Sequence, residues 1–154
     1  MKNLTLIIPA KNEAESLPDV LEELKKYNYK INVILHETDV ETIQSIKNYN
    51  IKMIYQKNLG YGDALIEGIN SCNTEYFCIF NADGSFDPSE LEKMYNTIHN
   101  KNLDFLFASR YQANSGSDDD TIITKIGNFL FTLIGNIFFK LKITDILYTF
   151  AMGR

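Results

Sequence analysis

The stretch EYFCIFNADGSFDPSELEKMYNTIHN, residues 75–100, joins a hydrophobic run to a helical pattern through a short polar segment. The run EYFCIFNA predicts a buried strand, because short continuous apolar runs are typical of strands covered on both faces. Pro88 predicts the start of a helix, where its missing N–H costs nothing. Between them stand four oxygen-bearing side chains: Asn81, Asp83, Ser85 and Asp87.

The same alternation of strand and helix recurs on both sides of this stretch. Apolar runs predict further strands at residues 4–10, 31–36, 51–56 and 103–111. Helical spacing of apolar residues predicts helices at residues 16–27, 39–50, 60–72 and 87–100, with Asp39 as an N-cap. This order predicts parallel βαβ units, and therefore an α/β domain with an open, mostly parallel, twisted sheet and flanking helices.

The composition indicates one globular core and excludes a nucleic-acid partner. A chain of 154 residues, 45% of them hydrophobic, is long enough for one domain. The net charge of -5 leaves no basic stripe for a phosphate backbone. Cys72 and Cys78 have no nearby histidine, which predicts reduced core cysteines. The first apolar run is too short for a signal peptide, so we expect a cytoplasmic protein.

Polar segments follow all five predicted strands. They comprise residues 10–15, 36–39, 57–64, 81–87 and 109–111. Ligands of open α/β sheets bind outside the carboxyl ends of the strands, so the five segments predict one site.

The segment after the fourth predicted strand suggests a metal. Asn81, Asp83 and Ser85 offer oxygen ligands at alternate positions, which suits Mg²⁺ or Mn²⁺ held jointly with a substrate diphosphate. Asp87 precedes Pro88, and a cap on the following helix is its expected role.

Two further segments have the chemistry of ligand contacts. Gly60 and Gly62 permit close backbone approach before a helix N-terminus, where anions are favoured, although neither a Walker loop nor a G-x-G-x-x-G fingerprint occurs. Asn12 and Glu13 have two interpretations: hydrogen bonds to a base or ribose, or capping of the helix that begins near Ser16.

Four segments in this order, LIIPAKNEAESLPDVL, NLGYGDALIEGI, FNADGSFDP and FASRY, resemble the family 2 glycosyltransferases of the GT-A fold, close to the dolichol-phosphate mannose synthase type. The resemblance extends over residues 4–111. It implies an inverting transferase of cell-envelope glycan biosynthesis that uses a UDP- or GDP-linked sugar, Mg²⁺ or Mn²⁺, and a polyprenyl-phosphate or glycan acceptor. The alternative is a catalytically incomplete module that binds the nucleotide sugar without turnover.

The resemblance also implies roles by position. Nucleotide contacts fall on Pro9, Ala10, Asn12, Glu13, Glu37, Asp39, Gly60, Gly62, Asn81 and Ala82, and metal contacts fall on Asn81, Asp83 and Ser85. Asp83 is also assigned to catalysis. Asn81 replaces the first acid of the family's D-x-D motif, so we expect weak metal binding in the absence of nucleotide.

The last third of the chain supplies two candidate catalytic residues. Arg110 follows the fifth predicted strand and has two interpretations, a phosphate contact or a surface ion pair. In the resembled family the general base commonly comes from a region beyond residues 145–154. Within this chain Asp145 and the group Ser117–Asp120 are the candidates. We expect a nucleotide-sugar-binding domain at residues 1–112, and at 113–154 a mobile acidic loop with an apolar helix, truncated relative to the family.

That apolar segment, TKIGNFLFTLIGNIFFKLKI at residues 124–143, repeats Ile-Gly-Asn at an interval of eight residues. Its uninterrupted part, residues 126–139, is shorter than the ~20 residues of a spanning helix. Two interpretations are open: a helix buried against the fold or in a homodimer, and an interfacial helix that presents a lipid-linked acceptor at the inner face of the membrane.

Overall fold

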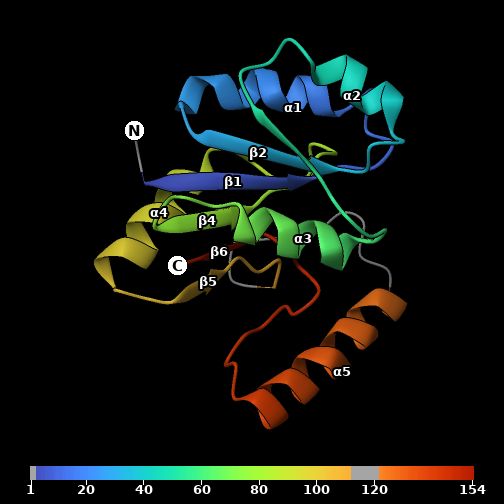
Figure 1. Ribbon diagram of the computed structural model, residues 1–154. Coiled ribbons are helices and arrows are strands. Elements are labelled where there is room, and N and C mark those ends of the chain that lie inside the picture. Colours follow the sequence, from blue (N-terminus) through green and yellow to red (C-terminus); the bar gives the residue numbers. More distant parts are fainter. Residues whose placement is uncertain (1–2, 112–121) are drawn as a thin grey trace. The chain divides into compact units, whose positions relative to one another are not determined.

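The computed structural model describes residues 3–111 and 122–154, and its internal contacts divide the chain into two compact units. The first unit consists of Met1–Leu106 with Met152–Arg154, and the second of Phe107–Ala151. The elements of both are labelled in Figure 1.

A six-stranded sheet forms the centre of the fold, in the order β3-β2-β1-β4-β6-β5. Its strands are β1 (Leu4–Pro9), β2 (Lys30–Leu35), β3 (Lys52–Tyr55), β4 (Tyr76–Ile79), β5 (Phe105–Phe107) and β6 (Ala151–Gly153). β1 pairs in parallel with β2 and β4, and β2 pairs in parallel with β3. The predicted mostly parallel α/β sheet is confirmed.

β6 is the strand that the sequence did not predict. It pairs antiparallel with β4, with Phe77 opposite Gly153. Two backbone bonds, Arg154 N–H to Asp104 O and Ala108 N–H to Phe150 O, both 2.9 Å, place it antiparallel to β5 as well. β5 therefore runs in the same direction as β1 to β4, as predicted, although it is limited to three residues.

The helices follow the predicted alternation. They are α1 (Leu17–Leu24), which continues into the short 3₁₀ helix η1 (Lys25–Tyr27), α2 (Val40–Ile46), α3 (Tyr61–Asn70), α4 (Glu90–Asn100) and α5 (Ile122–Phe139). Asp39 caps α2 by accepting the Thr42 N–H, as predicted. α5 ends four residues before the predicted boundary, because Lys140 and Lys142 have φ values of +53° and +56°.

In the first unit, helices pack against both faces of the sheet (Figure 1). Ile7, Ile34, Ala64 and Phe77 form one buried cluster, which attaches α3 to β1, β2 and β4. Tyr76 points to the opposite face from Phe77, since side chains alternate along a strand. There its ring meets that of Tyr95 of α4 at 5.6 Å.

The two cysteines are free thiols. Cys78 is fully buried in β4, and Cys72 is partly buried against the same face as the Ile7 cluster. Both observations agree with the predicted reduced state.

In the second unit α5 turns a polar stripe toward the segment 143–147. Asn128 accepts the Leu147 N–H at 3.1 Å, and Thr132 accepts the Ile146 N–H at 3.1 Å. Asn136 makes two bonds to the backbone of Ile143, at 2.8 and 2.9 Å. These contacts come from positions four residues apart, which form one face of a helix.

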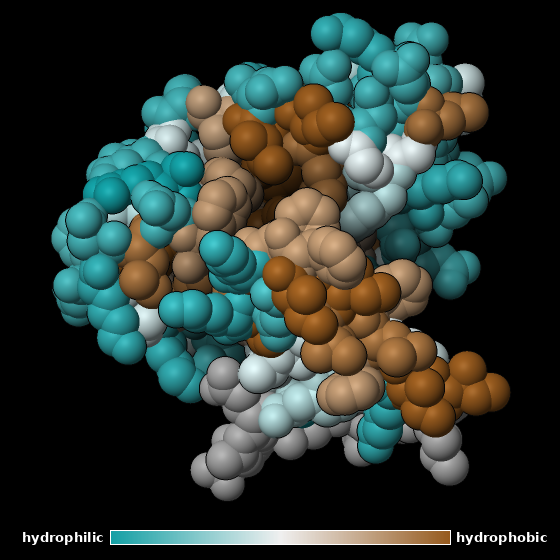
Figure 2. Space-filling model, turned by 90° about the horizontal axis from the view of Figure 1, so that it is seen from below, coloured by the Kyte–Doolittle hydropathy of each residue, from teal (hydrophilic) through white to brown (hydrophobic). Residues whose placement is uncertain are grey.

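Apart from Thr124 and Lys125, the exposed residues of α5 are apolar, and Figure 2 shows a broad hydrophobic surface on the face that it draws. The exposed apolar residues are Ile123, Ile126, Phe129, Leu130, Phe131, Leu133, Ile134, Ile137, Phe138 and Phe139. Within the described part of the chain, no helix combines the length and hydropathy needed to cross a bilayer.

Candidate functional site

The strand order reverses between β1 and β4, which are neighbours in the sheet. From β1 the chain proceeds outward to β2 and β3, and it then returns to β4 on the other side of β1. Ligands of open α/β sheets bind at such a switch point, outside the carboxyl ends of the strands. Residues 10–15 and 81–87 follow these two strands and are therefore the first candidates for a site.

The segment after β1 is tied to the N-terminus of α2. Asn12 adopts a left-handed conformation with φ +59°, and its N–H donates to Oδ2 of Asp39 at 2.7 Å. The Glu13 N–H donates to Oγ1 of Thr42 at 3.0 Å. Asp39 thus serves two elements, since its Oδ1 also accepts the Thr42 N–H. The structure brings together three residues assigned to nucleotide contacts: Asn12, Glu13 and Asp39.

Glu13 contacts the start of α1, since its backbone carbonyl accepts the Leu17 N–H at 3.0 Å. α1 has Ser16 as its N-cap without a side-chain cap hydrogen bond. The Glu13 carboxylate accepts the Ser16 hydroxyl, and the Asn12 side chain is exposed. Ala10 is buried and donates its N–H to the Ile34 carbonyl at 2.8 Å, whereas Glu37 is exposed. The nucleotide contacts of these residues stay a prediction.

A network that the sequence reasoning missed shapes the segment before α3. Gly60 is the N-cap of α3 with φ +124°, a conformation that favours glycine. Asp63 accepts the backbone N–H and the side-chain amide of Asn58 at 3.0 and 2.9 Å. The Asn58 amide lowers the pKa of the Asp63 carboxyl, and the Asn58 backbone N–H adds to this effect. In the sequence, the signal for this network was the acidic residue Asp63 in the first turn of the predicted helix. A Cβ at Gly62 would meet nothing within 4 Å, which leaves room for a ligand.

The segment after β4 forms a tight turn. Oδ1 of Asp83 accepts the Ser85 N–H at 2.9 Å, and the Asn81 side-chain amide donates to Oγ of Ser85 at 3.0 Å. Gly84 has φ +77° in this turn, and Ala82 is buried. The three residues assigned to the metal therefore contact one another directly.

Asp87 stands two residues before Ser89, which is the N-cap of α4 and has no side-chain cap hydrogen bond, so the cap predicted for Asp87 takes the form of a contact with the N-cap residue. Its Oδ1 accepts the Ser89 N–H at 2.8 Å, and this bond lowers the pKa of the carboxyl. Asp87 is thereby separated in role from Asp83, although both stand in the same segment.

The donor set at the turn fits a cation that receives further ligands from elsewhere. Asp83 is exposed, and its Oδ1 accepts the Ser85 N–H. One carboxylate, one amide and one hydroxyl are hard oxygen donors of the kind that Mg²⁺ prefers together with phosphates. Among residues 3–111 and 122–154 no cluster of three or more His, Cys, Asp or Glu side chains is arranged to hold a metal.

The second unit brings Arg110 and Asp145 together. The Arg110 Nε lies 2.9 Å from Oδ2 of Asp145, and the Arg110 Nη2 lies 3.1 Å from Oδ1. Asp145 is only 1% exposed. Arg110 therefore forms an ion pair, and its partner is buried. The other candidates for the base, Ser117–Asp120, lie outside the described residues.

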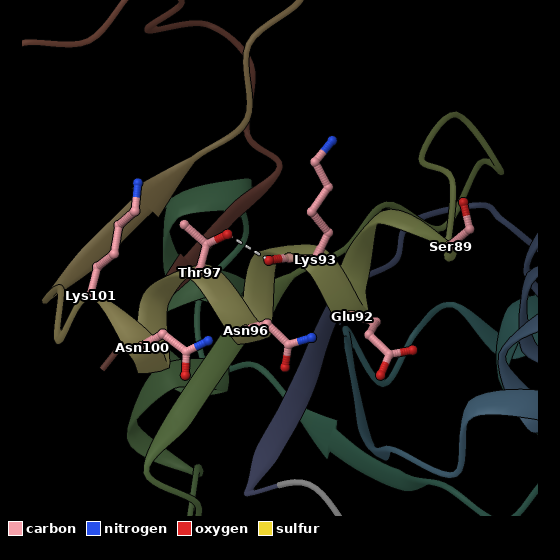
Figure 3. A pocket seen from close by; sticks show the side chains of 7 residues that line it. All are labelled: Ser89, Glu92, Lys93, Asn96, Thr97, Asn100 and Lys101. Carbon is pink, nitrogen blue, oxygen red and sulfur yellow. Dashed lines mark hydrogen bonds between the residues drawn. The ribbon is translucent and has the colours of Figure 1, made fainter.

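A shallow depression of about 540 Å³ lies on the outer side of α4 (Figure 3). It is lined by the polar side chains of Ser89, Glu92, Lys93, Asn96, Thr97, Asn100 and Lys101. None of these residues belongs to the segments at the strand ends, and the Thr97 hydroxyl is bonded to the Lys93 carbonyl at 2.7 Å. This is the solvent face of a helix.

Comparison with known proteins identifies a match to the family model described as Glycosyl transferase family 2, over residues 5–154. The UDP-N-acetylglucosamine–dolichyl-phosphate N-acetylglucosaminyltransferase of Methanococcus voltae is 26% identical, over 94% of this chain and 66% of its own length. The dolichol-phosphate mannosyltransferase of Pyrococcus furiosus is 27% identical, over 70% of this chain and 33% of its own length. The chain spans 41% to 53% of the length of other curated relatives.

A solved structure with the same fold is glucosyl-3-phosphoglycerate synthase from Mycobacterium tuberculosis in complex with Mn²⁺, UDP and phosphoglyceric acid. Its TM-score is 0.66 at 10% sequence identity, over 99% of this chain and 55% of that chain. The likeness confirms the predicted GT-A fold.

Proposed function

Since the chain belongs to glycosyl transferase family 2, we propose that it transfers a sugar from a UDP- or GDP-linked donor to a polyprenyl-phosphate acceptor with inversion. The acceptor oxygen attacks the anomeric carbon on the face opposite the nucleotide. The bond between that carbon and the diphosphate oxygen breaks, and the nucleoside diphosphate leaves with the bonding electrons.

One observation carries this proposal: the switch point between β1 and β4 holds the Asn12–Asp39 contact on one side and the Asn81–Asp83–Ser85 turn on the other. The first group offers hydrogen-bonding side chains to a nucleoside, with Pro9, Ala10, Glu13 and Glu37 as its neighbours in sequence. The second group offers oxygen ligands. Gly60 is the N-cap of α3 and Gly62 lies in its first turn, and a Cβ at either position would meet nothing within 4 Å, so an anion could approach this helix N-terminus closely.

Asp83, Asn81 and Ser85 would hold Mg²⁺ or Mn²⁺ together with the donor diphosphate. The ion, when bound, neutralises charge that develops on the leaving diphosphate. Asn81 contributes no charge, so the cation depends on the diphosphate for the rest of its ligands. The M. tuberculosis structure contains Mn²⁺ and UDP, which supports this pairing of metal and nucleotide.

A lipid-phosphate acceptor fits the chain better than a glycan hydroxyl. The two relatives from M. voltae and P. furiosus are named for dolichyl phosphate and dolichol phosphate, respectively. A phosphate monoester has its second pKa near 6, so it presents an ionised oxygen at neutral pH. A sugar hydroxyl would need a general base to remove its proton. The phosphate acceptor removes that requirement.

The exposed surface of α5 supports contact with a membrane at its cytoplasmic face. Ten large apolar residues of this helix are exposed, and the helix sequence contains no acidic residue. Lys125, Lys140 and Lys142 stand at its two ends, where they complement anionic lipid headgroups. Vesicles with anionic lipid should carry the protein to the top of a flotation gradient. Sedimentation as a dimer without flotation would instead assign this surface to a second copy of the chain.

The donor site is tested by calorimetric titration of UDP and GDP, with Mn²⁺ and with EDTA, on the wild type and on Asp83→Asn. We expect binding that requires Mn²⁺ and is lost in Asp83→Asn, and weak Mn²⁺ binding in the absence of nucleotide. The matched control is Asp87→Asn, which removes one negative charge from the same segment but acts on the start of α4. It should retain nucleotide binding.

Other outcomes are equally specific. If UDP or GDP binds equally well in the presence of EDTA, the result would favour a Rossmann-like domain that binds another phosphorylated ligand. No binding of either nucleotide would overturn the proposal. Nucleotide binding without transfer to a short prenyl phosphate would favour the second candidate, a module that binds the donor without turnover, for which the neutral Asn81 is the supporting observation.

A further inference from the structure

The start of α2 binds the backbone of the segment after β1 at two successive residues. Oδ2 of Asp39 accepts the Asn12 N–H at 2.7 Å, and Oγ1 of Thr42 accepts the Glu13 N–H at 3.0 Å. The two acceptors are themselves joined, because Oδ1 of Asp39 accepts the Thr42 N–H at 3.3 Å. Asp39 and Thr42 therefore act on the segment as one unit.

These two bonds determine the backbone conformation of Asn12. The Asn12 N–H belongs to the peptide group before its Cα atom, and the Glu13 N–H belongs to the peptide group after it. With both groups bound to α2, the φ and ψ angles of Asn12 are set, at a φ of +59°. Left-handed backbone is unfavourable for residues other than glycine, although asparagine tolerates it better than most. The exposed Asn12 side chain consequently leaves the segment in one fixed direction.

Thr42 acts from a position that a ligand cannot touch. The residue is 0% exposed, whereas Asn12 is exposed and Glu13 is half-buried. An effect of the Thr42 hydroxyl on nucleotide binding is therefore transmitted by Glu13, whose N–H it accepts. The resemblance to family 2 glycosyltransferases assigns roles to Asn12, Glu13 and Asp39 but none to Thr42.

We infer that Thr42 is a positioning residue of the donor site, which together with Asp39 holds Asn12 in the left-handed conformation that binds the nucleoside. This inference rests on the proposed function. The contacts form when the chain folds, so the nucleotide does not have to order the segment when it binds. Loss of the Thr42 hydroxyl should therefore weaken nucleotide binding.

The test compares Thr42→Val and Thr42→Ser in calorimetric titrations of UDP and GDP with Mn²⁺. Valine replaces the hydroxyl by a methyl group of similar size, whereas serine keeps the hydroxyl and removes the methyl group. We expect the Kd of the nucleotide to rise about three- to tenfold in Thr42→Val, the effect of losing one neutral hydrogen bond. Thr42→Ser should bind as the wild type does.

A merely structural role of Thr42 predicts a different pattern. Thr42→Ser also lowers the stability of the fold, because it removes a buried methyl group. If binding simply followed stability, both variants would bind more weakly, and this result would overturn the inference. An unchanged Kd in Thr42→Val would overturn it as well. The matched control is Thr97→Val, which removes a hydroxyl from α4 that donates to the Lys93 carbonyl, and it should bind as the wild type does.

Amide hydrogen exchange in the absence of nucleotide tests the contact itself. The Glu13 N–H should exchange about three- to tenfold faster in Thr42→Val than in the wild type or in Thr42→Ser. Asp39→Asn serves where Thr42→Val fails to fold. Its side chain keeps an oxygen for the Thr42 N–H but presents an amide group to the Asn12 N–H. Faster exchange at Asn12 together with weaker binding supports the inference, whereas weaker binding with unchanged exchange would assign Asp39 to direct contact and overturn it.

The exchange rates also separate this inference from the proposed function. If the wild type binds neither UDP nor GDP, the proposed function fails, and faster exchange at Glu13 in Thr42→Val still supports the hold of α2 on the segment. If nucleotide binds and Thr42→Val leaves the exchange of Glu13 unchanged, the positioning role is wrong and the proposed function stands. In transfer assays the donor KM of Thr42→Val should rise while kcat stays constant, because the nucleoside is remote from the bond that breaks.

Discussion

Gly68 tests whether α3 packs on the sheet as closely as the structure indicates. A Cβ at this position would lie 2.4 Å from Cγ2 of Ile7 and 3.0 Å from Cδ1 of Ile34. Both isoleucines are fully buried in the sheet, and the Ile7 methyl group belongs to a β-branched side chain with little freedom at χ1. We therefore expect Gly68→Ala to force the helix and the sheet apart.

Two opposing terms set the magnitude. Replacing glycine by alanine inside a helix gains about 0.5–1 kcal/mol of stability from backbone propensity. Overpacking of a filled core costs about 1–3 kcal/mol. Gly62→Ala is the matched control, because it makes the same exchange in the same helix and its Cβ meets nothing within 4 Å. The difference between the two variants isolates the cost of the clash, about 1–3 kcal/mol.

Urea unfolding followed by circular dichroism measures this difference. With a slope of about 2 kcal/mol per M, the midpoints of the two variants should differ by on the order of 1 M, with Gly68→Ala the less stable. Equal midpoints, or a more stable Gly68→Ala, would refute the packing of α3 against β1 and β2.

Two further predictions concern titratable groups. Asp87→Ala should lower the free energy of unfolding by about 0.5–1.5 kcal/mol at pH 7, since the Ser89 N–H loses its acceptor. The pKa of Asp87 is lowered in the fold, so its stabilisation is present above the unfolded pKa of about 3.9 and is lost as the pH falls through the folded pKa. The difference in urea midpoints at pH 7 should therefore shrink toward pH 2, and a difference independent of pH would refute this role. In alkylation with iodoacetamide followed by mass spectrometry, Cys72 should react well before Cys78, because Cys78 is completely buried and burial raises the pKa of its thiol. Equal rates in the folded protein would refute the burial of Cys78.

The sequence predicts the elements whose signal is local. The apolar runs and the helical spacings identify the first five strands and the five α-helices of the described residues. The polar segments after the strands predict the edge of the sheet at which a ligand binds. The cap at Asp39 is also local, because the acceptor and its donor Thr42 are three residues apart.

Contacts between distant residues escape this kind of reasoning. β6 is three residues long, too short for a period of two to be recognised, and its place between β4 and β5 depends on pairing across more than 40 residues. The second role of Asp39, as acceptor of the Asn12 N–H, joins residues that are 27 apart. The pair of Arg110 and Asp145 is 35 residues apart. Each contact exists only because the fold brings two unrelated segments together, so no window of sequence contains it.

The polar stripe of α5 could have been predicted from the sequence, and it indicates what kind of environment surrounds the helix. Asn128 and Asn136 stand in the two Ile-Gly-Asn repeats, eight residues apart, which is close to two turns of 3.6 residues. A helix at the surface of a protein in water turns its apolar stripe inward and its polar face outward. α5 does the reverse, because its asparagines bind the backbone of residues 143–147 and its isoleucines and phenylalanines are exposed. Such a helix satisfies its polar side chains within the chain and leaves apolar ones for its surroundings. This pattern favours an apolar neighbour, and it supports the membrane contact proposed for a lipid-linked acceptor.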